Sequence, residues 1–202
     1  MLLALACALG AAVFFRGPSP FAVDVWWNDL FAAAPSTPLL VFALTMNQIG
    51  GYWAAILLVP LGGALALFVA GRRWSAVYFL AASAASALFV QVLKHTFGRA
   101  RPADILVLSD YGSFPSGHTA NAATVATVAA VVFPFLWVRI VGGAWIVLMA
   151  FSRTYLHAHW LSDTVGGALV GIGTALLLGA VFSHLRARDQ DRRAARRALR
   201  PY

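Results

Sequence analysis

Residues whose types could exchange protons or bind an anion recur in three short stretches between residues 94 and 163. In the first stretch Arg101 follows Lys94 by seven residues, and Pro102 stiffens the chain directly after it. A phosphate carries up to two negative charges, which an arginine fork and a lysine point charge can neutralise together. This stretch therefore predicts an anion clamp, with a basic membrane anchor as the alternative interpretation.

The second stretch reads Pro115-Ser116-Gly117-His118 and precedes an apolar run. Ser116 suits the N-cap of a helix, and Gly117 lets the backbone approach an oxyanion closely, where the N–H groups of a helix start bind anions. His118 is placed to protonate a leaving oxygen. A cap serine is common at helix starts, so this stretch indicates an anion site only in combination with the other two.

The third stretch holds Ser152-Arg153, His159 and Asp163. The separation of four residues puts His159 and Asp163 on one helix face, if the helix already includes His159. A carboxylate there fixes the imidazole tautomer and stabilises its charged form. Capping of the helix by Asp163 alone is the other interpretation.

Together the three stretches supply the parts for phosphoryl transfer through a phosphohistidine. They are three cations, a helix-start anion site and two histidines, one of them beside a carboxylate. The cations provide the charge neutralisation, so no metal or other cofactor is expected. All these groups map to the same ends of their apolar runs, which predicts a substrate phosphate at the level of the lipid headgroups.

The composition points to lipid as the solvent of this 202-residue chain. Apolar residues make up 61% and charged residues 11%, against about 25% charged in soluble domains. Seven Asp and no Glu leave few ligands for a dinuclear metal hydrolase. Cys7 is the single cysteine and says nothing about the compartment.

The elements that must position the chemistry are six apolar runs, which predict an all-α, polytopic six-helix membrane bundle. The predicted spans are 2–15, 52–70, 75–95, 117–137, 140–157 and 162–183. The first run is interpreted as a span rather than a signal peptide, because no basic region precedes it. The Pro-punctuated segment 17–48, with Trp26, Trp27 and Phe31, predicts a helix lying in the membrane interface.

Charge bias orients these spans. Ten basic residues fall on one side, including seven arginines between Arg186 and Arg200, against five on the other. The positive-inside rule then predicts a multi-pass protein of the cell inner (plasma) membrane, with both termini cytoplasmic and the polar loop 96–115 on the extracytoplasmic face. Residues 1–185 would form the membrane domain, and 186–202 a basic cytoplasmic tail attracted to anionic lipid rather than to nucleic acid.

The motifs resemble those of the type 2 phosphatidic acid phosphatase superfamily, whose signature is K-x6-RP, then PSGH, then SR-x5-H-x3-D. The matching residues are Lys94 with Arg101-Pro102, Pro115-Ser116-Gly117-His118, and Ser152-Arg153 with His159 and Asp163. The resemblance implies that His159 attacks phosphorus, that Asp163 holds it and that His118 protonates the leaving group. It implies that the phosphate oxygens are bound by Lys94, Arg101, Ser116, Gly117 and Arg153.

Some questions stay open at this level. His157 stands where many members of that family have glycine. It is either a second polar contact to the substrate or an incidental residue at the interface. There are four rival interpretations: a same-fold phosphotransferase, a vanadate haloperoxidase, an anionic-lipid binding or transport protein, and a metal site at His157, His159 and Asp163. The substrate is expected to be a membrane lipid phosphate or diphosphate: a polyprenyl diphosphate such as undecaprenyl diphosphate first, then phosphatidylglycerol phosphate or phosphatidic acid. The sequence predicts no oligomeric state.

Overall fold

The computed structural model describes residues 1–17, 19–51 and 57–198, and these described residues form nine helices and no strand. The helices are α1 (Leu2–Arg16), α2 (Ala22–Ala32), α3 (Thr37–Gly50), α4 (Val59–Val69), α5 (Arg73–Phe97), α6 (Gly117–Val132), α7 (Leu136–Tyr155), α8 (Leu161–Val181) and α9 (Ser183–Ala198). The all-α prediction is therefore confirmed for the described part of the chain.

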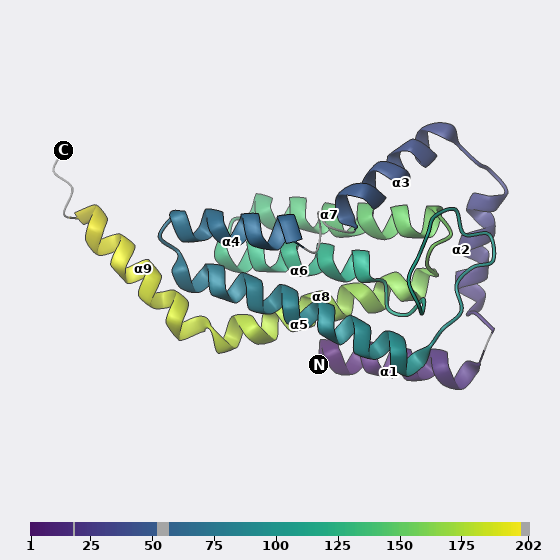
Figure 1. The fold of residues 1–202 in the computed structure, drawn as a ribbon, viewed down its shortest axis with the longest axis horizontal. Helices are drawn as coiled ribbons and strands as arrows, with labels where there is room; N and C mark the ends of the chain where they lie inside the picture. The colour runs from purple at the N-terminus through teal and green to yellow at the C-terminus, as the bar shows by residue number, and fades with distance from the viewer. Residues whose placement is uncertain (18, 52–56, 199–202) are drawn as a thin grey trace.

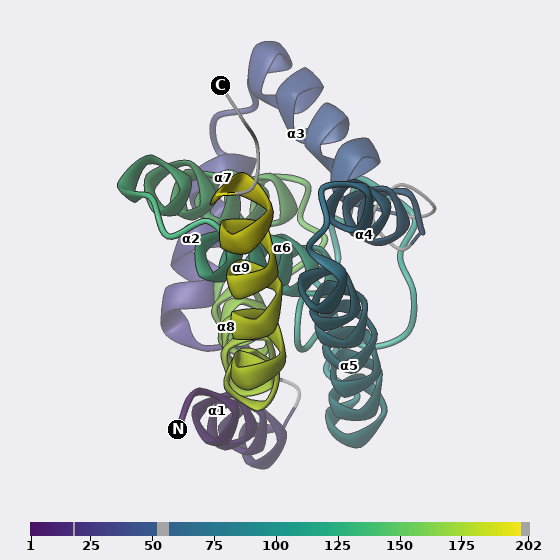
Figure 2. The same cartoon turned by 90° about the vertical axis from the view of Figure 1, so that its left-hand side faces the viewer.

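The helices α5, α6, α7 and α8 run side by side, and α6 contacts the other three (Figures 1 and 2). Around them α1 packs on α5 and α8, α3 on α7, and α4 on α5. The short α2 lies across one end of the bundle, and the basic α9 extends from the other end (Figure 1). The loops that precede α6 and α8 both lie at the end covered by α2 (Figure 1).

Glycines bring α6 and α8 close together. A Cβ added at Gly171 would lie 2.2 Å from the carbonyl oxygen of Ala120, and one at Gly167 would lie 2.4 Å from that of Ser116. The two backbones thus touch directly, as small residues allow in membrane bundles. Since α6 carries His118 and α8 carries Asp163, this contact holds two of the predicted site residues in register.

Three of the described helices, α5, α7 and α8, are long and apolar enough to cross a membrane, and α1 and α4 are apolar but shorter. Large apolar side chains such as Leu88, Val147 and Leu177 point outward and are more than half exposed. A soluble protein would expose a contiguous apolar surface of that kind only at a binding site. The chain therefore has the character of a membrane protein, while the count of six spans stays a prediction.

Several predicted boundaries differ from the structure. The span predicted at 117–137 was too long: α6 ends at Val132 and α7 already begins at Leu136. The cause is Pro134, which lacks a backbone N–H and disfavours helical conformation in the preceding residue. Of the span predicted at 52–70, residues 52–56 lie outside the described part, and α4 is its described helix.

The segment 17–48 holds two helices, α2 and most of α3, where the sequence predicted one. Trp27 donates a hydrogen bond to Thr154 Oγ1 (2.9 Å), and the Phe31 ring packs edge-on against Phe151 at 5.4 Å. These two side chains therefore face α7, whereas Trp26 is 60% exposed. The position of α2 at the membrane interface remains a prediction.

Candidate active site

The predicted site residues meet at the end of the bundle that α2 covers, although they come from four helices. Lys94 is in the last turn of α5, His118 in the first turn of α6, Arg153 in the last turn of α7, and His159 directly precedes α8. Because neighbouring helices are antiparallel, the connections 98–116 and 156–160 lie at the same end. The convergence predicted from the sequence is thus present in the structure.

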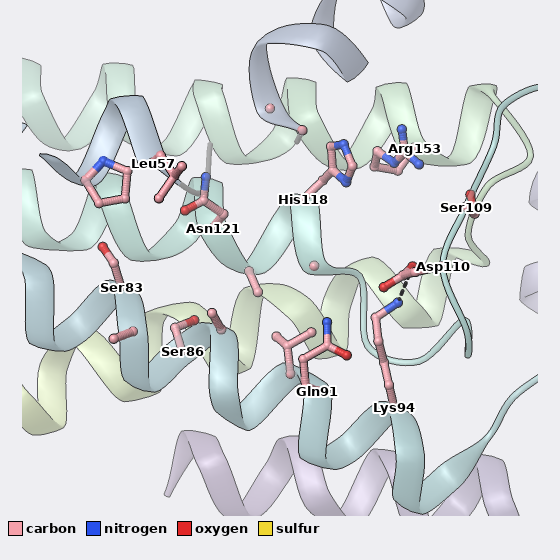
Figure 3. Close-up of a pocket in the computed structure, with 18 of the residues that line it drawn as sticks. Leu57, Ser83, Ser86, Gln91, Lys94, Ser109, Asp110, His118, Asn121 and Arg153 are labelled. Atoms are coloured by element: carbon pink, nitrogen blue, oxygen red, sulfur yellow. Dashed lines mark hydrogen bonds and ion pairs between the residues drawn. The ribbon is translucent and has the colours of Figure 1, made fainter. Parts of the chain in front are cut away.

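A cavity of about 620 Å³ opens beside these residues, between α4, α5 and α6. One end is polar, with Lys94, Asp110 and Arg153, and the other reaches Leu57 and Ser83 (Figure 3). Five of the predicted site residues line it: Lys94, Gly117, His118, Arg153 and His159. The other three predicted site residues do not line the cavity but contact or adjoin residues that do. They are Arg101, Ser116 and Asp163.

The His159 imidazole is held in one orientation. It is 3% exposed, and its Nδ1 lies 2.8 Å from the carbonyl oxygen of Ser113 and 3.6 Å from Asp163 Oδ2. A carbonyl oxygen only accepts hydrogen bonds, so Nδ1 must carry the proton and Nε2 keeps its lone pair. That Nε2 lies 3.2 Å from Arg101 Nη1. Burial, reinforced by Arg101 and Arg153, lowers the pKa of His159 well below its usual value. The neutral ring can then act as a nucleophile.

Asp163 is the predicted partner of His159, but the helix begins later than the prediction assumed. The helix α8 begins at Leu161, after Trp160 as N-cap, so His159 lies outside it. The pair nevertheless meets because Asp163 Oδ2 accepts a hydrogen bond from Trp160 N (2.9 Å), which folds the carboxylate back over the helix start. Asp163 therefore both caps the helix and faces His159, and the two interpretations of this residue are compatible.

Asp163 is tied to a second carboxylate through Arg99. Arg99 donates to Asp163 Oδ1 (2.5 Å) and to Asp24 Oδ2 (2.7 Å), and Asp24 accepts from Ser162 N (2.8 Å). Both carboxylates are at most 1% exposed. The Ser113 hydroxyl also hydrogen-bonds Asp163. A buried carboxylate needs such partners to stay ionised, so this network supports a charged Asp163 beside the imidazole.

Two clamp cations share backbone partners. Lys94 Nζ donates to the Gly112 carbonyl (2.8 Å) and Arg101 Nη2 donates to the same oxygen (2.9 Å). Arg101 Nη1 also donates to the Ala158 carbonyl, one residue before His159. Each cation further pairs with Asp110, Lys94 at 3.0 Å and Arg101 at 2.8 Å. The loop 98–116 thus fixes both charges next to His159.

Arg153 and His118 form the opposite wall, which α3 supports. Arg153 is 2% exposed and donates to the Asn47 side-chain oxygen. A Cβ at Gly51 would lie 2.5 Å from His118 Nε2, so the end of α3 closes on this ring. His118 Nε2 is buried and finds no hydrogen-bond partner among the described residues. An imidazole nitrogen without a partner beside a cavity is suited to exchange a proton with a ligand.

The start of α6 has the predicted cap. Ser116 is its N-cap, and its hydroxyl accepts from Thr119 Oγ1 (3.1 Å) and, at 3.5 Å, from Thr119 N. Ser116 is fully buried, so its contribution to an anion is through the helix start, while Gly117 lines the cavity. A Cβ at Gly117 would meet just Val90 at 3.8 Å, which leaves its backbone open to a ligand.

His157 points away from the cavity. Its Nδ1 lies 2.7 Å from Asn28 Oδ1 and 3.0 Å from Asp104 Oδ2, and its backbone φ is 51°. Glycine adopts that left-handed conformation without strain, so a glycine at this position would be relaxed where His157 is not. His157 therefore does not join His159 and Asp163, and no group of three metal-ligating side chains occurs among the described residues.

Comparison with known proteins assigns the family, because the family model described as PAP2 superfamily matches residues 75–186. The chain belongs to the PAP2 superfamily. It is similar to phosphatidylglycerophosphatase B of Bacillus subtilis (strain 168), with 40% identity over 93 residues, 41% of this chain and 45% of that protein. It is also similar to undecaprenyl-diphosphatase of Sulfolobus acidocaldarius, with 38% identity over 63 residues, 31% of this chain and 30% of that protein. These matches span less than half of each relative.

A solved structure extends the similarity over the whole PAP2 fold. The crystal structure of a transmembrane PAP2-type phosphatidylglycerolphosphate phosphatase from Bacillus subtilis is 26% identical, with a TM-score of 0.76. The superposition covers 91% of this chain and 94% of that one. The helices outside the family-model match, α1 to α4, are therefore part of a shared architecture.

Sequence reasoning missed several contributors to this site: Asp24, Asn47, Arg99, Asp110 and Ser113. For two of them the sequence offered a clue to a role in the site. Asp110 is an acid in the loop between two groups of cations, and Arg99 lies two residues before the clamp arginine. Asp24 and Asn47 sit in helices remote in sequence, where no local pattern marks them. Ser113 acts partly through its backbone carbonyl, which no side-chain pattern reveals.

Proposed function

We propose that this chain is an integral membrane lipid phosphatase that works through a phosphohistidine at His159. The observation that carries the proposal is the fixed tautomer of His159, whose Nδ1 proton faces the Ser113 carbonyl. The Nε2 lone pair is thereby free of a proton and faces Arg101 Nη1 at 3.2 Å, with the cavity beside it. A neutral, oriented imidazole next to a cluster of cations is suited to attack a phosphate.

The proposed reaction has two displacement steps. His159 Nε2 attacks phosphorus, an N–P bond forms as the P–O bond to the leaving group breaks, and His118 gives a proton to the leaving oxygen. Water then attacks phosphorus while His118 takes up its proton, the N–P bond breaks, and inorganic phosphate leaves. Throughout, Lys94, Arg101 and Arg153 neutralise the phosphoryl oxygens together with the N–H group of Gly117. The Ser116 N–H already donates to the Asp163 carbonyl (3.0 Å), so Ser116 contributes as the N-cap of α6. Asp163 stabilises the charged ring.

The cavity supports a lipid as the substrate. Away from the cations its walls are mostly apolar, with Leu57, Pro60, Leu61 and Leu80 beside Ser83, and its volume is in the usual range for small-molecule sites. A phosphate held at the cationic end would place a hydrocarbon chain along this wall. A polyprenyl diphosphate is the first candidate and phosphatidylglycerol phosphate or phosphatidic acid the next, and the names of the two relatives above include both kinds of lipid.

The charge pattern supports a placement in the cell membrane. The ten basic residues on one side favour a topology with both termini in the cytoplasm and the active site at the extracytoplasmic face. In that arrangement α2 lies at the outer headgroup level, and α9, which carries six of the seven arginines in 186–200, lies against the anionic inner leaflet.

The test is release of phosphate by the purified protein in detergent with excess EDTA. The substrates are undecaprenyl diphosphate, phosphatidylglycerol phosphate, phosphatidic acid and a soluble phosphate ester. The proposal predicts turnover of at least one lipid well above the soluble ester, at a rate that EDTA does not change. No release from any lipid would contradict the hydrolase function, and activity that EDTA abolishes and a divalent ion restores would contradict catalysis by the side chains alone.

A further inference from the structure

The carboxylate of Asp110 occupies the cationic end of the cavity. Its Oδ1 lies 3.0 Å from Lys94 Nζ and 2.8 Å from Arg101 Nη2. Among the described residues that line the cavity, Asp110 is the sole acid. In Figure 3 its side chain enters the cavity from the loop and meets Lys94, opposite His118 and Arg153. A carboxylate with these two partners stands where the phosphate clamp would hold an oxygen of the substrate.

The charge of Asp110 is maintained by the same cations. Burial alone would raise the pKa of this carboxyl, but Lys94 and Arg101 outweigh that effect and the pKa lies below its usual value. An ionised carboxylate and an ionised phosphate repel each other, and both need the positive charge of Lys94 and Arg101. The two anions therefore compete for one place.

The clamp keeps its geometry without this carboxylate. Lys94 and Arg101 both donate to the Gly112 carbonyl, and Arg101 also donates to the backbone oxygen of Asp110 at 3.1 Å. These backbone contacts do not involve the Asp110 carboxylate, whose side chain is 58% exposed and so has room to turn away. By contrast the third cation, Arg153, pairs with the neutral Asn47. Displacement of Asp110 would thus free two charges while leaving them in position.

We propose that Asp110 fills the phosphate position of the free protein, so that any phosphate must displace this carboxylate before it binds. Inorganic phosphate must displace the carboxylate by its charge alone, so the site stays free of it. A lipid phosphate overcomes the same cost because its chain is also buried against the apolar wall at Leu57, Leu61 and Leu80. In this role Asp110 lowers the affinity of the clamp for every phosphate, and the role rests on the lipid phosphatase function proposed above.

The experiment compares Asp110→Asn with wild type, and uses Asp104→Asn as a matched control. Asp104 lies on the same loop but contacts His157 and Asn28 rather than the clamp. Anion binding is measured without turnover, from the shift of the thermal unfolding midpoint with increasing inorganic phosphate. The KM for the lipid and the inhibition constant of inorganic phosphate are measured in parallel.

Removal of the carboxylate charge should make Asp110→Asn bind inorganic phosphate about tenfold more tightly, since a like charge next to the ligand is gone. The KM for the lipid should fall as well, because the lipid phosphate displaces the same carboxylate, and Asp104→Asn should match wild type in both quantities. Equal or weaker phosphate binding by Asp110→Asn would overturn the proposal, because Asp110 would then position the cations. Tighter phosphate binding without any lipid turnover would uphold the competition at the clamp while refuting the proposed function.

Discussion

The two walls of the active site differ in how fully their polar groups are paired. On the nucleophile side, defined as His159, Asp163, Arg99, Asp24 and Ser113, the two carboxylates are buried and each accepts several hydrogen bonds. On the cavity side, defined as Lys94, Asp110, His118 and Arg153, His118 Nε2 has no partner among the described residues and Asp110 is 58% exposed.

This difference separates two tasks. In the proposed mechanism His159 must keep one tautomer and one direction through both displacement steps, which requires partners that do not change when substrate binds. The cavity side must exchange its partners for those of a ligand, which is easier where a buried group lacks one and an exposed carboxylate can leave. The nucleophile side is thus preorganised, and the cavity side is arranged to receive the phosphate.

The largest effect should follow from loss of the nucleophile. His159→Gln keeps a polar side chain but removes the attacking nitrogen, so turnover should fall by at least about 10³-fold, as in other covalent catalysts. The measurement is phosphate release from the lipid, with the unfolding midpoint as the check on folding. His95→Gln, which replaces a histidine bonded to Gln91 on the surface of α5, is the control and should retain activity. A rate within tenfold of wild type would remove His159 as nucleophile.

A slightly smaller effect should follow on the cavity side. His118→Asn removes the proton donor, and kcat with the lipid should fall about 10²- to 10³-fold. A nitrophenyl phosphate has a leaving group that needs no proton, so its rate should fall much less. Measurement of kcat for both substrates checks this. Equal losses would show that His118 acts on something other than the leaving oxygen.

An intermediate effect should follow from weakening the support of Asp163. Arg99→Gln removes the cation between Asp163 and Asp24, and kcat should fall about 10- to 100-fold, as for other residues that orient a reacting group. The KM should hardly change, because Arg99 does not line the cavity. Combined with Asp163→Asn, the losses should be less than additive, since both act on one imidazole. Additive losses would separate Arg99 from the nucleophile side.

The smallest effect should follow at His157, which neither wall uses. His157→Gly loses the contacts to Asn28 and Asp104 but relieves the positive φ, so kcat should stay within about threefold of wild type. His157→Ala loses the same contacts and keeps the strain, so its unfolding midpoint should be lower than that of the glycine variant. A large loss of turnover in His157→Gly would instead indicate that this residue contacts the substrate.

The sequence predicted the residues of the three motifs better than the residues that hold them in place. The three motifs meet because antiparallel helices with short connections bring Lys94, His118 and His159 to one end, a consequence of topology that hydropathy reveals. Asp24 lies 75 residues before Arg99, and Asn47 lies 106 residues before Arg153, so tertiary packing alone creates these pairs. The wrong end of the span predicted at 117–137 could have been avoided from the sequence. Pro134 disfavours a helical residue before it and therefore marked the end of the helix.

Trapping of the intermediate tests the central claim most directly. The protein is mixed with a lipid labelled in the phosphate that is released, quenched in alkali, and digested to locate the label. The account predicts an alkali-stable, acid-labile phosphoryl group on the peptide that contains His159, at a higher level in His118→Asn with an activated substrate and absent from His159→Gln. Turnover with no trapped label in either protein, or label on a different residue, would contradict the phosphohistidine at His159.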